Sequence, residues 1–258
     1  MTKKWVKFPH PDKRFAYDAA SLKKHWLRLH RGDGEPFPKD VAVQDAWRHF
    51  HAGEFGAAVE AGTRAGGAGI NAAVKAQVVY ATYLEKSDKA KIALLEDAAG
   101  WAEARCRAAP KDANAHYLHA FALGRYSQGI SVAKALAQGL GGRVKDALLS
   151  AIRLDPKHAD AHIAYGAYQA EVIDKVGGLV AGVTYGAKKD SAIEHFGKAI
   201  KLNPDSAIAR IEYANGLIML FGKSRLAEAE KLYREAAAAT PADAMERLDI
   251  ARAQAELD

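Results

Sequence analysis

A chain of 258 residues that is 49% hydrophobic and 26% charged can build a buried core, which excludes an intrinsically disordered protein. Its single cysteine, Cys106, excludes an intrachain disulfide and favours a reducing compartment. The net charge of +6 comes from residues 1–39, which hold ten Lys and Arg against four Asp and Glu. The remainder is balanced, so we expect no nucleic acid partner.

The first unit along the chain, residues 1–38, is a basic arm followed by a predicted helix over residues 12–30. The helix ends where Gly and Pro recur in residues 32–38. Apolar side chains recur on one of its faces, so we expect that face to pack on the next helices and the charges to lie in solvent. This interpretation is preferred to an arm that binds nucleic acid or an acidic membrane. The apolar residues are Phe15, Leu22, Trp26 and Leu29.

From residue 39 onward the pattern is helix, turn, helix, with no convincing alternation of period two. The sequence therefore predicts an all-α protein. A last helix, over residues 242–257, is charged on one side and is expected to cap the end of the array. The predicted helix pairs span residues 39–65, 70–109, 112–154, 159–202 and 206–239.

A short pattern, Ala-x3-aromatic-x2-Ala-x4-Pro, repeats in the second half of the chain. It occurs at residues 192–204 and 229–241, with looser copies at 144–156 and 98–110. Residues three and four apart lie on one stripe of a helix, and the proline ends the helix. Repetition of one such unit predicts a helical repeat array, because a single unit cannot bury its apolar face alone.

This pattern resembles that of the tetratricopeptide repeat superfamily over residues 39–241. The resemblance implies a right-handed solenoid of about five helix pairs. It also implies that the small residues of the pattern, Ala199 and Ala236, sit where two helices approach closely. Two consecutive copies exceed the 34-residue repeat length, because of insertions at about residues 127–142 and 174–188 that are rich in Gly and apolar residues.

Because of their apolar content, we expect both insertions to be ordered as short helices or tight apolar loops. They also weakly resemble the T-component of periplasmic TRAP transporters, which implies a hydrophobic ligand or a transporter partner. The sequence shows no lipobox or export signal. We therefore expect a cytoplasmic protein, periplasmic only if an export signal was removed. The longest uncharged apolar run, 176–187, is too short to span a bilayer.

The repeat resemblance implies a concave groove lined by the first helix of each pair. The leading hypothesis is therefore a non-catalytic adaptor that binds a protein or peptide segment there. The groove residues carried over from the repeat frame are Trp47, Phe50, Asn114, Tyr117, Phe121, Ile163, Ala167, Ile211, Asn215 and Ile218.

The alternative hypothesis is a protein that binds a hydrophobic small molecule or lipid in a pocket built by the two insertions. A closed apolar cavity beneath the insertions would favour this alternative over the adaptor. The candidate pocket residues are Ile130, Leu136, Leu140, Val176, Leu179, Val183 and Tyr185.

Other chemistry finds little support in the sequence, and an enzyme is a third, weaker hypothesis. His158 and His162 have metal-ligand spacing, but no further ligands accompany them, and His158 is expected to be exposed. Gly222 is expected to end a helix rather than to begin a phosphate loop. Cys106 has no base tied to it by a motif. We therefore expect no cofactor, no metal and no catalytic residue.

Overall fold

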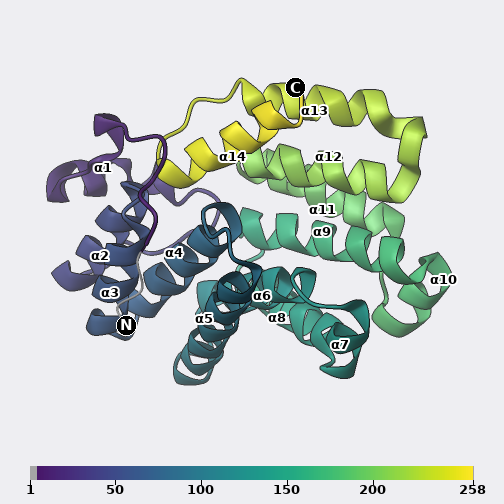
Figure 1. Cartoon of the computed structure of the whole chain (residues 1–258), viewed down its shortest axis with the longest axis horizontal. Helices are drawn as coiled ribbons and strands as arrows, with labels where there is room; N and C mark the ends of the chain where they lie inside the picture. The colour runs from purple at the N-terminus through teal and green to yellow at the C-terminus, as the bar shows by residue number, and fades with distance from the viewer. Residues whose placement is uncertain (1–4, 258) are drawn as a thin grey trace.

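The computed structural model describes residues 5–257, and its regular secondary structure over that range is entirely helical (Figure 1). The predicted five pairs and C-terminal helix are confirmed. The pairs are α2 (Val41–His51) with α3 (Phe55–Ala65), α4 (Gly69–Tyr83) with α5 (Asp88–Ala108), α6 (Ala113–Gln128) with α8 (Leu140–Leu154), α9 (Ala159–Val176) with α11 (Lys189–Leu202), and α12 (Ala207–Phe221) with α13 (Leu226–Ala237).

The helix ends follow local capping chemistry. Ser87 caps α5, Asp112 caps α6 and Ser206 caps α12, each side chain accepting a hydrogen bond from the backbone N–H three residues on. Gly222 ends α12 with φ 56°, in the left-handed region that favours glycine. The predicted role of Gly222 as a helix terminator is therefore confirmed.

The helix predicted over residues 12–30 is wrong in extent, because the chain forms two helices there. A short 3₁₀ helix, η1 (Lys13–Phe15), precedes α1 (Ala19–Leu29). The break occurs because the Asp18 side chain accepts a hydrogen bond from Ser21 N, which fixes the start of α1 at Ala19. The predicted packing of this segment is confirmed: Phe15, Leu22 and Trp26 are buried, and Leu29 packs on the same core.

The insertions form short helices, as predicted. The first contains α7 (Val132–Ala137), and the second contains α10 (Gly178–Val180) followed by a π-helical turn, η2 (Ala181–Tyr185). Both α7 and η2 pack against α8.

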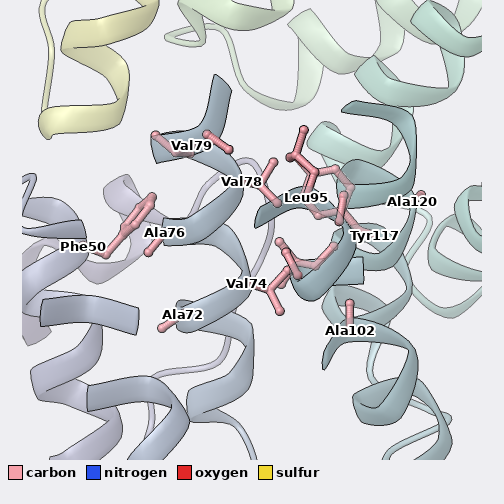
Figure 2. Close-up of a cluster of buried hydrophobic side chains, with 14 of the residues drawn as sticks. Phe50, Ala72, Val74, Ala76, Val78, Val79, Leu95, Ala102, Tyr117 and Ala120 are labelled. Atoms are coloured by element: carbon pink, nitrogen blue, oxygen red, sulfur yellow. The ribbon is translucent and has the colours of Figure 1, made fainter. Parts of the chain in front are cut away.

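The first helices of the pairs contact one another in the order α2, α4, α6, α9, α12 and form an inner layer. Helix α4 lies between α2, α3, α5 and α6, and almost every residue of it is buried (Figure 2). Helices α3 and α4 approach closely at Gly62 and Gly69. A Cβ added at Gly62 would lie only 2.5 Å from Gly69 O, so this approach requires glycine there. Most of α4 is apolar, which suits a helix surrounded on all sides.

The C-terminal helix α14 (Ala244–Ala255) joins the two ends of the array. It packs on α12 and α13 and also contacts α2, so that it lies between the last helices and the first (Figure 1). The Arg28 guanidinium pairs with both carboxylate oxygens of Glu246 at 2.6 and 3.0 Å. Tyr17 Oη donates to Ala242 O at 2.7 Å. The array is therefore closed by contacts between its termini.

A larger side chain at Ala199 tests the predicted close approach of two helices at this small residue of the repeat pattern. Ala199 is fully buried on α11 and packs with Ile163 of α9 and Ala209 of α12. Ala199→Leu is expected to lower the free energy of unfolding by roughly 1–3 kcal/mol, because a well-packed interface has no room for the added carbons. Urea denaturation measures the change, and Ala227→Leu at an exposed position of α13 is the control. Equal stability of the two variants would contradict the close approach.

Candidate binding cavity

The loop after α1 crosses the inner layer instead of running through solvent. Asp160 N donates to Gly32 O at 3.0 Å. A Cβ at residue 32 would lie only 2.2 Å from Asp160 Oδ1, so the loop can approach α9 this closely because the residue is glycine. The two acidic residues that follow, Asp33 and Glu35, are both buried. The loop therefore places two carboxyl groups against the inner helices.

Asp33 is held by a buried ion pair with α4. Lys75 Nζ lies 2.6 Å from Asp33 Oδ2 and 4.0 Å from Asp160 Oδ2. His30 Nδ1 lies 2.9 Å from Asp33 Oδ1. Although burial opposes ionisation, the charge of Lys75 holds the pKa of Asp33 well below its usual value, and the pKa of Lys75 is raised. The pair is therefore charged at neutral pH.

Glu35 is held by two amides instead of a cation. Asn114 Nδ2 donates to Glu35 Oε2 at 2.7 Å, and Asn71 Nδ2 does so at 3.2 Å. His158 Nδ1 accepts from Ala161 N, so its Nε2 carries the proton and donates to Asn114 Oδ1 at 2.9 Å. Burial, followed by the charges of Asp33 and Asp112, raises the pKa of Glu35 to about 8.

Helix α14 fills a further part of the inner face. Tyr83 Oη of α4 donates a short hydrogen bond to Asp249 Oδ1 of α14. Leu248 is buried in the main hydrophobic core. The loop and α14 thus occupy much of the surface that the repeat resemblance assigned to a peptide. An apolar cavity remains between α6, α8 and α9.

This cavity has a volume of about 250 Å³. Its walls are mostly apolar, with Tyr117 and Phe121 of α6 stacked at a ring separation of 5.9 Å. The insertions line it as well, through Leu136 of α7 and Tyr185 of η2. Met245 of α14 reaches it from the closing helix. The inner layer and both insertions therefore share one site.

Charged and amide groups gather among the apolar walls. Arg125 Nη2 lies 3.2 Å from Glu212 Oε1, and its guanidinium lies 5.7 Å from the Phe121 ring centre. Gln128 Nε2 donates a short hydrogen bond to Glu171 Oε1. Burial, followed by the charge of Glu212, raises the pKa of Glu171. The cavity can therefore offer apolar contact to one part of a ligand and hydrogen bonds to another.

Eight of the residues predicted from the sequence line this cavity, and they come from both hypotheses. Four were assigned to the groove and four to the insertion pocket. They are Tyr117, Phe121, Ile163 and Ala167 of the first set, and Leu136, Leu140, Val176 and Tyr185 of the second.

The other predicted groove residues do not line the cavity. Trp47 and Phe50 are buried in an aromatic cluster under α1, with ring centroids 5.5 Å apart, because the N-terminal segment covers this face of α2. Asn114 is buried in the polar contacts around Glu35. Their assignment to an open groove is corrected.

On α12, Ile211 is buried in the core of the last pair. Asn215 Oδ1 accepts from Tyr233 Oη at 2.5 Å, so its amide contributes to the packing of α12 on α13. Ile218 is exposed outside the cavity. These three residues therefore do not form the predicted binding stripe.

Three predicted insertion residues also lie elsewhere. Ile130 is half-buried against the main core. Leu179 and Val183 are exposed, because α10 and η2 turn one side outward while Ala181 packs inward. Their assignment to the insertion pocket is wrong.

Sequence reasoning missed the polar group Arg125, Glu171 and Glu212, together with Tyr83 and Met245. Tyr83 and Met245 come from helices distant in sequence, and only closure of the array brings them to the cavity. For the buried loop, by contrast, a sequence signal existed on α4, where Asn71 and Lys75 interrupt a mostly apolar helix.

Residues 5–257 contain no cluster of three or more His, Cys, Asp or Glu side chains suited to hold a metal ion. His158 is buried and caps α9, which corrects its expected exposure. Burial and then the charge of Asp112 raise the pKa of Cys106 to about 11, so its thiol stays protonated at neutral pH. Across the described part of the chain, no helix is both long and apolar enough to cross a membrane.

Comparison with known sequences decides the family. The sequence model of regulator of microtubule dynamics protein 1-3 matches residues 72–257. The chain belongs to this family. The match contains every cavity-lining residue, whereas the buried loop around Asp33 and Glu35 precedes it.

A solved structure confirms the repeat fold of this family member. TTC0263, a thermophilic TPR protein of Thermus thermophilus, superposes with a TM-score of 0.58 and 17% identity, covering 83% of this chain and 98% of its own. MamA protein matches with a TM-score of 0.38 and 21% identity, and the match covers 76% of this chain and 88% of the MamA chain. No curated protein matches the sequence. These matches do not bear on the resemblance of the insertions to the TRAP T-component.

Proposed function

We propose that this protein is a non-catalytic binding protein whose site is the cavity between α6, α8 and α9. The observation that supports the proposal is that inner-layer residues and both insertions converge on this one apolar space. An apolar cavity of ~150 Å³ is sufficient to admit benzene, so one of about 250 Å³ can take a larger apolar group.

The ligand we propose is an amphipathic small molecule with an apolar chain and a polar end. Tyr117, Phe121 and Ile163 would contact the chain. Arg125 and Gln128 would donate hydrogen bonds to the polar end, in exchange for part of their present pairing with Glu212 and Glu171. A free peptide is less favoured as the ligand. The protein's own loop around Asp33 and Glu35, together with α14, fills much of the inner face that an extended peptide would need.

A cavity-filling variant tests this function. Ala167→Trp places an indole in the cavity from the half-buried position on α9. We expect it to weaken binding of a fluorescent fatty acid by about tenfold or more, because the indole takes the volume that the apolar chain would use, and tenfold corresponds to ~1.4 kcal/mol. Fluorescence titration measures the dissociation constant.

Ala227→Trp, at an exposed position of α13, is the matched control and is expected to bind the probe as the wild type does. Equal affinity of the Ala167→Trp variant and the wild type, with both proteins folded by circular dichroism, would contradict the proposed site.

The second candidate function is an adaptor that binds an apolar protein segment at the same cavity. The repeat fold commonly serves as a protein-binding surface, and the name of the family describes regulation of microtubule dynamics. Under this alternative, Ala167→Trp would abolish capture of a protein partner, while the wild type would show no saturable binding of the fatty acid.

A further inference from the structure

The second insertion exposes large apolar side chains at its tip. Leu179 and Val183 are each 83% exposed. They lie four residues apart on the continuous helical segment of α10 and η2, so they point to the same side. Val180, between them, is also exposed. A single exposed apolar residue is common on protein surfaces, but a cluster marks an interaction site.

The first insertion adds to this surface. Val132 and Leu136 lie four apart on α7, both are exposed, and α7 has no buried residue. Helices α7 and α10 lie at the same end of the molecule (Figure 1). The apolar tip is defined here as these two residues together with those of the second insertion. Its members are Val132, Leu136, Leu179, Val180 and Val183.

The two insertion segments that carry the apolar tip are positively charged. Residues 130–145 and 175–189 hold six Lys and Arg and no Asp or Glu. The exposed ammonium groups of Lys134 and Lys188 make no ion pair with any of residues 5–257. Two of the six are paired with carboxylates outside these segments: Lys175 Nζ lies 3.4 Å from Asp174 Oδ2, and Arg143 Nη2 lies 3.7 Å from Glu103 Oε1. Exposed apolar side chains beside lysines suit a bilayer surface with anionic headgroups, since the apolar groups enter the acyl boundary and the ammonium groups meet phosphates.

The apolar tip is continuous with the cavity. Val132 and Leu136 belong to both, and two further lining residues, Val176 at the end of α9 and Tyr185 at the end of η2, lie on either side of Leu179 and Val183 in the sequence. We propose that the apolar tip docks the protein on an anionic phospholipid membrane, with the cavity mouth facing the lipid. This inference rests in part on the proposed function, because docking would let an amphipathic ligand pass between bilayer and cavity without crossing water.

Vesicle co-sedimentation of the full chain tests the docking surface. The variant is Leu179→Asp with Val183→Asp, and the control is Leu27→Asp with Val41→Asp, two exposed aliphatic residues on α1 and α2. Wild type and control are expected to sediment with phosphatidylcholine–phosphatidylserine vesicles. The tip variant should bind the vesicles more weakly by about tenfold or more, because two large apolar side chains no longer enter the bilayer.

Added salt and vesicles of phosphatidylcholine alone are expected to reduce binding of the wild type, because the lysines then lose their anionic partners. Failure of the wild type to bind anionic vesicles would overturn the inference. So would equal binding by the tip variant, or a loss of binding in the control as large as that in the tip variant.

Titration with the fluorescent fatty acid in the absence of vesicles separates the two proposals. The tip variant should bind this probe as the wild type does, because both substituted side chains lie outside the cavity. Vesicle binding by a wild type that takes up no probe would leave the docking surface in place and refute the proposed cavity function. Probe uptake by a wild type that binds no vesicles would leave the proposed cavity function in place and refute the docking surface.

Discussion

Lys75→Met is expected to lower the free energy of unfolding by ~3–5 kcal/mol, because removing one partner of a buried ion pair leaves an uncompensated buried charge. Lys75 is buried on α4, and its Nζ lies 2.6 Å from Asp33 Oδ2. Methionine has nearly the same length but supplies no charge, so Asp33 would be left with His30 and the backbone N–H of Glu35 as its remaining partners. Urea denaturation at neutral pH measures the loss.

Two further proteins make this prediction specific. Lys39→Met, at an exposed position, should leave stability nearly unchanged. Adding Asp33→Asn to Lys75→Met should restore part of the loss, because the double variant removes both members of the pair. If the double variant were less stable than Lys75→Met by the full effect of Asp33→Asn alone, the two side chains would not be coupled.

Glu35→Gln is expected to change how stability depends on pH. The pKa of Glu35 is raised from its ordinary value to about 8, first by burial and then by the charges of Asp33 and Asp112. Below the ordinary pKa both folded and unfolded states hold the proton, and the stabilising contribution is complete. As the pH rises toward 8, the unfolded state loses this proton while the folded state keeps it, so the contribution is progressively lost.

The glutamine side chain of this variant cannot ionise, and its carbonyl oxygen can still accept from Asn71 and Asn114. The variant should therefore nearly match the wild type near pH 5 and exceed it at pH 9 by on the order of 4 kcal/mol, since a tenfold change in proton affinity corresponds to ~1.4 kcal/mol. Thermal and urea unfolding across this range measure the difference. Glu60→Gln, at an exposed carboxylate of α3, is the control, and parallel pH profiles of Glu35→Gln and wild type would contradict the assignment.

Below neutral pH, two histidines have the opposite effect on stability from Glu35: they lower the free energy of unfolding as the pH falls. Burial lowers the pKa of His30 and of His158 to about 4. Because these values lie below the ordinary pKa of histidine, the stabilising contribution is present at neutral pH and is lost as the pH falls toward 4. Glu35→Gln should leave this acid limb unchanged, which separates the titration of the carboxyl group from that of the imidazoles.

The elements of the fold that could be predicted are those determined by interactions between residues close together in the sequence. Ser87, Asp112 and Gly222 fix helix ends through hydrogen bonds and backbone conformations within a few residues. Ala199 and Phe196 belong to a repeating stripe whose period is that of the helix itself. Such signals indicate the helix pairs, and these agree with the structure.

The arrangement of the site could be predicted only in part. Tyr117, Phe121 and Ile163 followed from the repeat frame, and Leu136 and Tyr185 from the apolar character of the insertions. That both sets face one cavity depends on how α7 and η2 fold back on α8.

The filling of the inner face left only one signal in the sequence, the polar residues Asn71 and Lys75 within α4. It depends on contacts between residues far apart in the chain, such as Glu35 with Asn114 and Tyr83 with Asp249. Trp47 and Phe50 were assigned to an open surface for the same reason, since the segment that covers them belongs to no repeat.

The closed array also fixes its own size. Repeat proteins grow or shrink by duplication or loss of whole units, because each unit touches only its neighbours. Here Glu246 must meet Arg28, and Asp243 must meet His51 at 2.8 Å. A sixth pair inserted between α2 and α13 would displace α14 from both partners, and a deleted pair would leave it overlapping them. Five pairs are therefore a geometric requirement of this chain, and changes in length are confined to turns such as those that carry α7 and α10.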